Sequence, residues 1–214
     1  VDNTFMTPYL QRPLELGADI TVQSATKFLA GHADLLAGVA ATNDSDLAVQ
    51  LHRGQLVSGA LLPPIDSYRL LQDVKTLALR LERQQQNARE LIDFLSARPE
   101  VEQIFYAGSS SEEQAEVQSR QARGIGSVFS LLLKDGGDAQ AFARALPIFV
   151  NAVSLGGIES LVSLPAHTTH GAYAQEHRDE FGVDDRLVRL AIGIEDVQDL
   201  IAALEIGLKA AFAG

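Results

Sequence analysis

Residues 20–32 have the sequence ITVQSATKFLAGH, in which a strand-like run is followed by a loop with reactive side chains. The β-branched run ITV at its start predicts a short buried strand. Two hydroxyl residues, Ser24 and Thr26, then flank Lys27. Hydroxyls donate hydrogen bonds to phosphate oxygens, and a lysine in a partly desolvated loop can form a Schiff base. The stretch therefore suits a phosphate-bearing cofactor, although such residues alone are more often a surface lysine between two loop hydroxyls.

The segments that follow predict one more strand and then helices. A second apolar run at 35–40 predicts another buried strand, and Asp44 is expected to cap a short helix that Gly54 ends. Residues 59–64 are expected to form an irregular bridge. Apolar residues then recur at helical spacing over residues 66–98, which predicts a long helix that can bend along its length and stops before the next proline.

After residue 100 the patterns alternate between strand and helix. The predicted strands are 101–106, 127–133, 149–154 and 187–192, and the predicted helices are 111–121, 138–146 and 196–212. This alternation predicts an α/β protein in which helices pack against a sheet. We expect a domain boundary within the long helix, so that residues 1–90 form one domain and residues 91–214 a second.

The composition excludes several classes of protein. The chain has 214 residues, 46% of them apolar, so it can bury a substantial core. The lack of cysteine excludes a disulfide framework, a thiolate metal site and a thiol nucleophile. The 28 acidic and 17 basic residues give a net charge of −11, so no nucleic-acid partner is expected. No apolar run reaches the roughly 18 residues that span a bilayer, so no membrane partner is expected either.

The chain begins with the residues VDNTF, without an initiator methionine and without a polar lead-in. These residues are typical of the interior of a strand and not of its start. We therefore expect the chain to be a fragment of a longer protein.

Four motifs occur in order along the chain. The first joins VDNTF at residues 1–5 to SATK at residues 24–27. The second and third are SLGGIESL at residues 154–161 and LPAHTTH at residues 164–170, and the fourth is LVRLAIGIED at residues 187–196. Together they resemble the cofactor and substrate segments of the Cys/Met-metabolism family of pyridoxal-phosphate (PLP) enzymes, the transsulfuration group. The resemblance covers essentially the whole chain, but only the C-terminal portion of a family member.

This resemblance implies a fold, a cofactor and an assembly. The fold is that of the fold-type I PLP-dependent transferases, which resemble aspartate aminotransferase. Residues 1–90 are then the C-terminal part of the PLP-binding large domain, including the start of an interdomain helix, and residues 91–214 are the small α/β domain. The implied cofactor is pyridoxal 5'-phosphate, and the implied assembly is a homotetramer, a dimer of dimers that includes the missing N-terminal part.

The resemblance also implies roles on the cofactor side. Lys27 matches the lysine that binds the cofactor covalently and later moves protons. Asp2 matches the aspartate that pairs with the pyridinium nitrogen, where a buried carboxylate keeps that nitrogen protonated. Without Lys27 at this distance, a strand-end aspartate that binds its own backbone would be the better explanation of Asp2. Ser24 and Thr26 match hydroxyls on the cofactor phosphate.

On the substrate side, Arg189 matches the arginine that binds the substrate α-carboxylate with its planar fork of donors. An internal Asp or Glu partner is the alternative for an arginine in an apolar run. Ser154 matches a second contact to that carboxylate, or is a turn residue, and Thr169 lies where the family lines the same end of the pocket. Val153 is at a specificity position that is acidic in many γ-lyases and γ-synthases, and its lack of charge weakens recognition of the distal ammonium of cystathionine. No metal site is expected, because the two histidines of residues 167–170 supply too few ligands.

The leading hypothesis is a cytoplasmic PLP-dependent carbon–sulfur lyase. It would eliminate a thiol from cystathionine, or from a related sulfur amino acid, and release a keto acid and ammonia. One alternative is a γ-replacement enzyme, either a cystathionine γ-synthase or an O-acyl- or O-succinyl-homoserine sulfhydrylase. The other alternative is an inactive fragment or assembly module, because the family builds part of its pocket from N-terminal loops and a neighbouring subunit.

Overall fold

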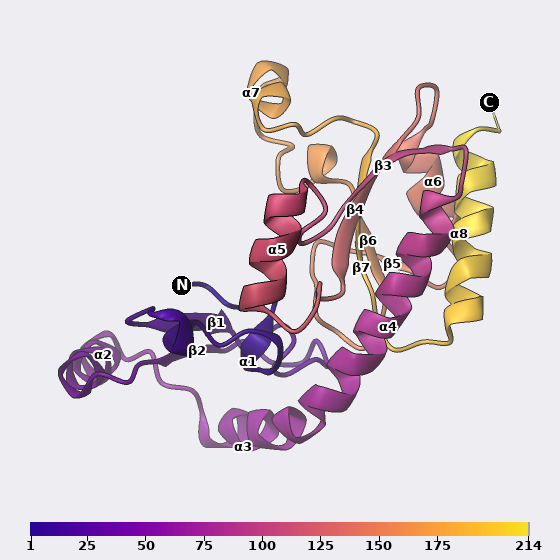
Figure 1. Cartoon of the computed structure of the whole chain (residues 1–214). Coiled ribbons are helices and arrows are strands. Elements are labelled where there is room, and N and C mark those ends of the chain that lie inside the picture. Colours follow the sequence, from indigo (N-terminus) through magenta and orange to yellow (C-terminus); the bar gives the residue numbers. More distant parts are fainter. Residues whose placement is uncertain (214) are drawn as a thin grey trace.

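The structure, a computed structural model, describes residues 1–213. It contains a two-stranded sheet near the N-terminus and a five-stranded sheet in the C-terminal part, with helices around them (Figure 1). The α/β class predicted from the alternating pattern is therefore confirmed.

The two-stranded sheet lies next to the first short helices. β1 (Thr21–Ser24) pairs antiparallel with β2 (Gly38–Ala41), and both lie where the apolar runs predict strands. The prediction that β2 is buried is wrong, because β2 forms one edge of this small sheet and all four of its residues are exposed. Two helical turns that no pattern predicted, α1 (Thr7–Leu10) and η1 (Pro13–Leu16), precede β1.

The helix α2 (Ser45–Ser58) begins where the sequence predicts and ends later. The Asp44 carboxylate caps it by accepting hydrogen bonds from the backbone N–H groups of Asp46 and Leu47, at 2.8 and 2.9 Å. The predicted end at Gly54 is wrong, because the helix continues to Ser58 and is capped by Gly59, whose φ of 70° is left-handed. A glycine inside a helix costs only about 1 kcal/mol, whereas a left-handed C-cap specifically favours glycine.

The long helix predicted for residues 66–98 is two helices with a break between them. α3 (Pro64–Asp73) leads into a 3-10 turn, η2 (Val74–Thr76), and α4 (Leu77–Ser96) follows. The break has a local cause, because the Thr76 hydroxyl and the Arg80 guanidinium both donate to the carbonyl of Asp73, at 3.0 and 3.1 Å.

The five-stranded sheet has the order β3-β4-β7-β6-β5, and only the β5–β6 pair is parallel. β6 was not predicted, because it is three residues long and all three are buried, so no alternation marks it. Most of the predicted strand at 149–154 is irregular, since β5 comprises only two residues. The strands are β3 (Val101–Phe105), β4 (Val128–Leu133), β5 (Val150–Asn151), β6 (Leu161–Ser163) and β7 (Leu187–Ala191).

The helices of the C-terminal part pack against this sheet and against one another. α8 contacts both α4 and α6, which places the three on the same side of the sheet (Figure 1). The short turns η3 and α7 between β6 and β7 were not predicted. The bounds are α5 (Glu112–Gln121), α6 (Ala139–Ala145), η3 (Pro165–His167), α7 (Gln175–Glu180) and α8 (Val197–Ala211).

Two apolar clusters form the core. The larger one runs from Ala88 to Ala211 and fills the space between the five-stranded sheet and its helices. The smaller one combines Phe28 and Leu81 with residues of the C-terminal part such as Leu155. We propose that residues 1–90 and 91–214 are two domains, and this proposal is supported by the way the larger cluster begins at Ala88, inside α4.

None of the helices within residues 1–213 is both long enough and apolar enough to cross a membrane.

The core of the C-terminal part generates a stability prediction on α8. Leu204 is fully buried in the larger cluster, whereas Ile206 on the same helix is 48% exposed. We expect Leu204→Ala to lower the free energy of unfolding by about 2–5 kcal/mol, because it leaves a cavity. The matched change Ile206→Ala should cost less than about 1 kcal/mol. Denaturant unfolding of the two variants measures this, and equal losses would contradict the described packing of α8.

Candidate functional site

Lys27 lies in the turn that follows β1, and its side chain contacts the loop that carries Ser154. The turn is closed by hydrogen bonds from Ala30 N to Ala25 O at 3.0 Å and from Gly31 N to Lys27 O at 2.8 Å. Lys27 is half-buried, and its Nζ donates to the Oγ of Ser154 at 3.0 Å. Two of the predicted site residues, 127 positions apart in the sequence, are therefore neighbours.

Arg189 joins the same group from β7. Its Nη2 donates to the backbone carbonyl of Ser154 at 3.1 Å. Burial lowers the pKa of Arg189 below its usual high value, but a guanidinium still stays charged at neutral pH. Within residues 1–213 no carboxylate forms an ion pair with Arg189, so the alternative of an internal acidic partner is not met. A half-buried guanidinium that has no carboxylate partner in the protein is suited to bind the carboxylate of a ligand.

The loop that carries Ser154 packs directly on the turn that carries Lys27. Gly156 has a φ of +85°, and a Cβ at this position would lie 2.6 Å from the backbone N of Phe28. Two residues later, Ile158 N donates to the carbonyl of Gly31 at 3.0 Å. The close approach therefore explains the first glycine of the SLGG motif, since only a residue without a Cβ fits at position 156.

A partly buried pair of residues, which we call the Ser160–Glu195 joint, links the SLGGIESL motif to the LVRLAIGIED motif. The Glu195 carboxylate accepts hydrogen bonds from the N and the Oγ of Ser160, at 2.6 and 2.9 Å. Ser160 Oγ in turn accepts from the N–H of Gly193 at 2.9 Å. No pattern in the sequence predicted this pair, because its two residues are 35 positions apart. The joint fixes the end of β7, and hence Arg189, against the Ser154 loop.

Asp2 is held beside β1 but is not buried. It pairs with Val22 in an isolated parallel bridge, and its Oδ1 accepts from Thr4 N at 2.8 Å. Hydrogen bonds from the side chain and the backbone of Thr4 lower the pKa of Asp2, so the carboxylate is ionised at neutral pH. The expectation of a buried carboxylate is wrong for residues 1–213, where Asp2 is exposed because it lies at the edge of β1.

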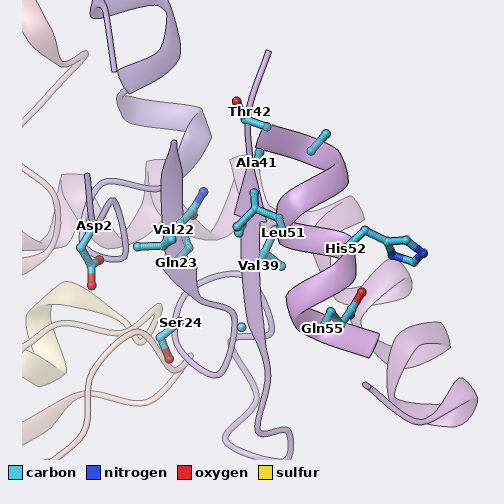
Figure 2. A pocket seen from close by; sticks show the side chains of 13 residues that line it. Asp2, Val22, Gln23, Ser24, Val39, Ala41, Thr42, Leu51, His52 and Gln55 are labelled. Carbon is cyan, nitrogen blue, oxygen red and sulfur yellow. The ribbon is translucent and has the colours of Figure 1, made fainter. Parts of the chain in front are cut away.

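Asp2 and Ser24 line one cavity of about 730 Å³ between β1, β2 and α2. Figure 2 shows their side chains at the end of this cavity away from α2, while the ring of His52 points away from the strands. The backbone N–H of Ser24 donates a hydrogen bond to Thr4 Oγ1 at 2.8 Å, and the Ser24 hydroxyl has no hydrogen bond within residues 1–213. Lys27 is not part of the cavity wall, since its amine points to Ser154.

Thr26 uses its hydroxyl to hold the loop. Thr26 Oγ1 donates to the carbonyl of Ala37 at 3.3 Å and accepts from Ala37 N at 3.0 Å. The hydroxyl hydrogen therefore already has an acceptor, unlike that of Ser24. A phosphate contact from Thr26 would need this hydrogen bond to be exchanged.

The remaining predicted residues lie at the rim. Val153 is 57% exposed and directly precedes Ser154. Thr169 is exposed as well, and its hydroxyl is hydrogen-bonded to His170 Nδ1 at 2.9 Å, with no hydrogen bond to the Lys27, Ser154 and Arg189 group. In the described part of the chain, no three His, Asp or Glu side chains are grouped in a way that could hold a metal ion.

These residues fit PLP by the chemistry of their donors. A primary amine, an ionised carboxylate and an unshared hydroxyl are the groups that the aldehyde, the pyridinium nitrogen and the phosphate of the cofactor require. All three come from residues 2–27, on β1 and beside it, and Arg189, which can bind a carboxylate, shares Ser154 as a partner with the lysine. The fold and this donor set define the class of fold-type I enzymes that use PLP.

Within that class, the chain belongs to the family of Cys/Met metabolism PLP-dependent enzymes, whose model matches residues 1–209. The resemblance found in the four motifs is therefore confirmed, and PLP is the cofactor of this family.

Similar proteins include enzymes with several names. The chain is 44% identical over 201 residues to the cystathionine gamma-lyase of Bacillus subtilis, which covers 94% of this chain and 53% of that protein. It is 46% identical over 213 residues to the L-methionine gamma-lyase of Pseudomonas deceptionensis, covering 98% of this chain and 53% of that one. The chain therefore spans about half the length of these relatives.

Solved structures of the family have the same fold. Cystathionine gamma-lyase from Lactobacillus plantarum, complexed with L-serine, matches with a TM-score of 0.94 and 37% identity over 98% of this chain and 55% of that one. Cystathionine gamma synthase from Xanthomonas oryzae pv. oryzae, in complex with cystathionine, matches with a TM-score of 0.93 and 38% identity over 100% of this chain and 55% of that one. These matches confirm the predicted fold-type I architecture.

The close approach at Gly156 generates a prediction with a matched control. Gly182 also has a positive φ, of 66°, but a Cβ there would meet nothing within 4 Å. We expect Gly182→Ala to cost about 1–2 kcal/mol of unfolding free energy, from backbone strain alone. Gly156→Ala should cost about 2–5 kcal/mol, because the steric clash with Phe28 adds to the strain. Denaturant titrations compare the two, and a smaller loss at Gly156 would refute the described packing of the two loops.

Proposed function

We propose that this chain supplies the catalytic lysine and the substrate-carboxylate site of a PLP-dependent carbon–sulfur lyase. Its substrate would be cystathionine or a related sulfur amino acid, and its products a thiol, a keto acid and ammonia. The observation that carries the proposal is the convergence of Lys27 and Arg189 on the two sides of Ser154. The names of the relatives, which are cystathionine and methionine lyases, support the choice of reaction.

On the cofactor side, each residue has one task. Pyridoxal phosphate, when bound, supplies the aldehyde for the substrate amine and the ring that accepts electrons from the substrate. Asp2, ionised and next to β1, would hold a proton on the ring nitrogen, and Ser24 would donate its hydroxyl to the phosphate. Thr26 would add a second hydroxyl after giving up its bond to Ala37. Lys27 would hold the cofactor covalently until the substrate takes its place.

On the substrate side, the geometry explains how a proton can be moved. Arg189 would bind the α-carboxylate through its planar fork, and Ser154 would contact the same carboxylate. The amine of Lys27 lies 3.0 Å from Ser154 Oγ, so the freed amine is close to the carboxylate end of the substrate. Because Cα is bonded to that carboxylate, Nζ would be close enough to remove the Cα proton.

The elimination then needs a sulfur leaving group. The C–S bond breaks at Cβ or Cγ, the sulfur takes a proton and departs as a thiol, and water releases the rest as a keto acid and ammonia. Loss from Cβ of cystathionine gives pyruvate and homocysteine, and loss from Cγ gives 2-oxobutyrate and cysteine. Val153, exposed at the rim, and Thr169 would line the substrate end of the pocket. An uncharged Val153 favours a substrate without a distal ammonium over cystathionine.

A γ-replacement enzyme is the second candidate, because cystathionine gamma synthase is among the similar structures. One assay separates the two. The complete gene product is supplied with an activated homoserine ester and cysteine, and the products are identified. A thioether product supports replacement, whereas keto acid release from cystathionine or methionine supports the lyase.

We further propose that the enzyme works in the cytoplasm as a homotetramer, a dimer of dimers. In this assembly, other parts of the protein would complete the cofactor pocket that residues 1–213 line on one side. Analytical ultracentrifugation of the complete gene product with PLP tests the assembly. Titration of the 214-residue chain alone with PLP tests whether it is instead an inactive fragment or assembly module, since tight lysine-linked binding would argue against that alternative.

The proposal predicts the effect of removing the Lys27 amine. In the complete gene product, Lys27→Ala should abolish keto acid release and prevent borohydride from linking PLP to the chain, because no other amine within residues 1–213 is hydrogen-bonded to Ser154. Lys75→Ala is the control, since Lys75 is exposed and its amine donates a hydrogen bond to Gln72. Turnover and the mass of the borohydride-treated protein are measured. Unchanged turnover in the Lys27 variant would rule the mechanism out.

The proposal also predicts the effect of replacing the fork of Arg189. Arg189→Lys keeps the charge but loses the two-point contact with a carboxylate. Substrate KM should rise by about 10- to 100-fold, the equivalent of one charged hydrogen bond. Arg69→Lys, on the exposed face of α3, is the control and should leave KM unchanged. Steady-state kinetics decide, and an unchanged KM in the Arg189 variant would remove this residue from the substrate site.

A further inference from the structure

A row of buried polar side chains lies on the inner face of α4. It consists of Arg80, Gln84 and Asn87, which we call the polar stripe of α4. Their spacing of four and then three residues puts them on one face of the helix. Arg80 is 5% exposed, and Gln84 and Asn87 are fully buried. Apart from Gln85, the other buried positions of α4 are apolar, so the stripe interrupts a helix face that otherwise packs by hydrophobic contact.

The first member of the stripe holds the turn that carries Lys27. Arg80 Nη1 donates to the carbonyl of Phe28 at 2.8 Å, and Nη2 donates to the carbonyl of Leu29 at 3.2 Å. These are the first two carbonyls after Lys27. Gly31 leaves the space that the guanidinium occupies, because a Cβ there would collide with it.

The other two members hold the two remaining segments of the site. Gln84 Nε2 donates to the carbonyl of Gly157 at 2.6 Å, in the loop that carries Ser154. Asn87 Nδ2 donates to the carbonyls of Gly193 and Glu195, at 3.1 and 2.9 Å, where the chain leaves β7. One helix face thus contacts all three segments that bear Lys27, Ser154 and Arg189.

The polar stripe lowers the stability of the fold relative to apolar side chains at the same positions, so packing alone does not explain its presence. The side-chain oxygens of Gln84 and Asn87 are buried and have no hydrogen-bond partner within residues 1–213. A buried unpaired polar atom is unfavourable, whereas an apolar side chain of the same size could be neutral or better. The recorded partners of both side-chain amides are backbone carbonyls, to which the amide N–H groups donate. The stripe therefore favours one arrangement of the loops over others.

We propose that the polar stripe of α4 positions Lys27 relative to Ser154 and Arg189, so that Arg80, Gln84 and Asn87 are positioning residues for the reaction. The inference rests on the proposed function for its catalytic consequence. Its structural part, that one helix face sets the distances among three loops, is independent of the reaction. The stripe was not predicted from the sequence, because the helical spacing was assigned from the apolar residues of α4 alone. Three polar residues at helical spacing between leucines were the available signal.

The test uses an isosteric change on each face of α4. Gln84→Met keeps the volume and removes the hydrogen bond to Gly157. Gln86→Met is the same change on the exposed face, where the Gln86 side chain donates a hydrogen bond to Glu90. Hydrogen exchange is measured on the complete gene product without PLP. We expect the amide of Ile158 to exchange about two- to tenfold faster in the Gln84 variant, as the loss of one hydrogen bond implies, and to be unchanged in the Gln86 variant.

A second variant keeps the test decisive if Gln84→Met does not fold. Asn87→Leu should speed exchange at the amides of Gly193 and Ile194 but not at the turn of Lys27. Local effects of this kind support positioning. Exchange that rises equally in all peptides, in step with a lower unfolding midpoint, would show a general stabilising role and overturn the proposal, as would unchanged exchange.

Kinetics of the PLP-loaded enzyme supply the functional readout. If the stripe positions the lysine, Gln84→Met should lower kcat by about 10- to 100-fold, the scale of a small misplacement, with little change in KM. An unchanged kcat would overturn the catalytic part of the inference. If the unmodified enzyme releases no keto acid, the proposed function fails instead, and the exchange result still decides whether the stripe fixes the loops.

Discussion

The contact between Gly156 and the backbone of Lys27 and Phe28 is the constraint on which the candidate site depends. It requires a left-handed glycine, with a φ of +85°, at a point where any Cβ would meet main-chain atoms. Main-chain atoms cannot move aside as a flexible side chain can, so the distance between the two loops is fixed. Ser154 is placed two residues before this contact, and its hydroxyl and carbonyl thereby lie between the amine of Lys27 and the guanidinium of Arg189.

The charges of this arrangement oppose those of the whole chain. The chain carries a net charge of −11, yet neither Lys27 nor Arg189 forms an ion pair with a carboxylate within residues 1–213. A half-buried guanidinium that has no carboxylate partner is stabilised by an anion that binds beside it. The proposed substrate α-carboxylate would be this anion, and the net negative charge of the chain would disfavour the binding of anions elsewhere on the surface.

The sequence predicted the elements with strong patterns and missed those that depend on distant partners. The strand at 127–133 and the helix at 196–212 were predictable, because alternation and helical spacing are local properties. β6 and the Ser160–Glu195 joint were not, because they are defined by neighbours far along the chain. Lys27, Ser154 and Arg189 could be named from motif resemblance, but their mutual distances come only from the fold. The exposure of Asp2 was missed, since no pattern shows what covers a residue.

Helix α4 contacts both the hydrophobic core and the candidate site. Its apolar residues belong to both hydrophobic clusters, Leu81 to the smaller and Leu91 to the larger. Its polar residues contact the loops of the site. A helix anchored in two cores is a stiff frame, because bending it would disturb packing on both sides. Carbonyl groups bonded to such a frame keep their separations even though their own loops have little regular structure. Burial of α4 therefore has two effects. It makes the unpaired side-chain oxygens of Gln84 and Asn87 unfavourable, and it makes the helix rigid. Exposing these oxygens to water would require the loops that pack on α4 to move.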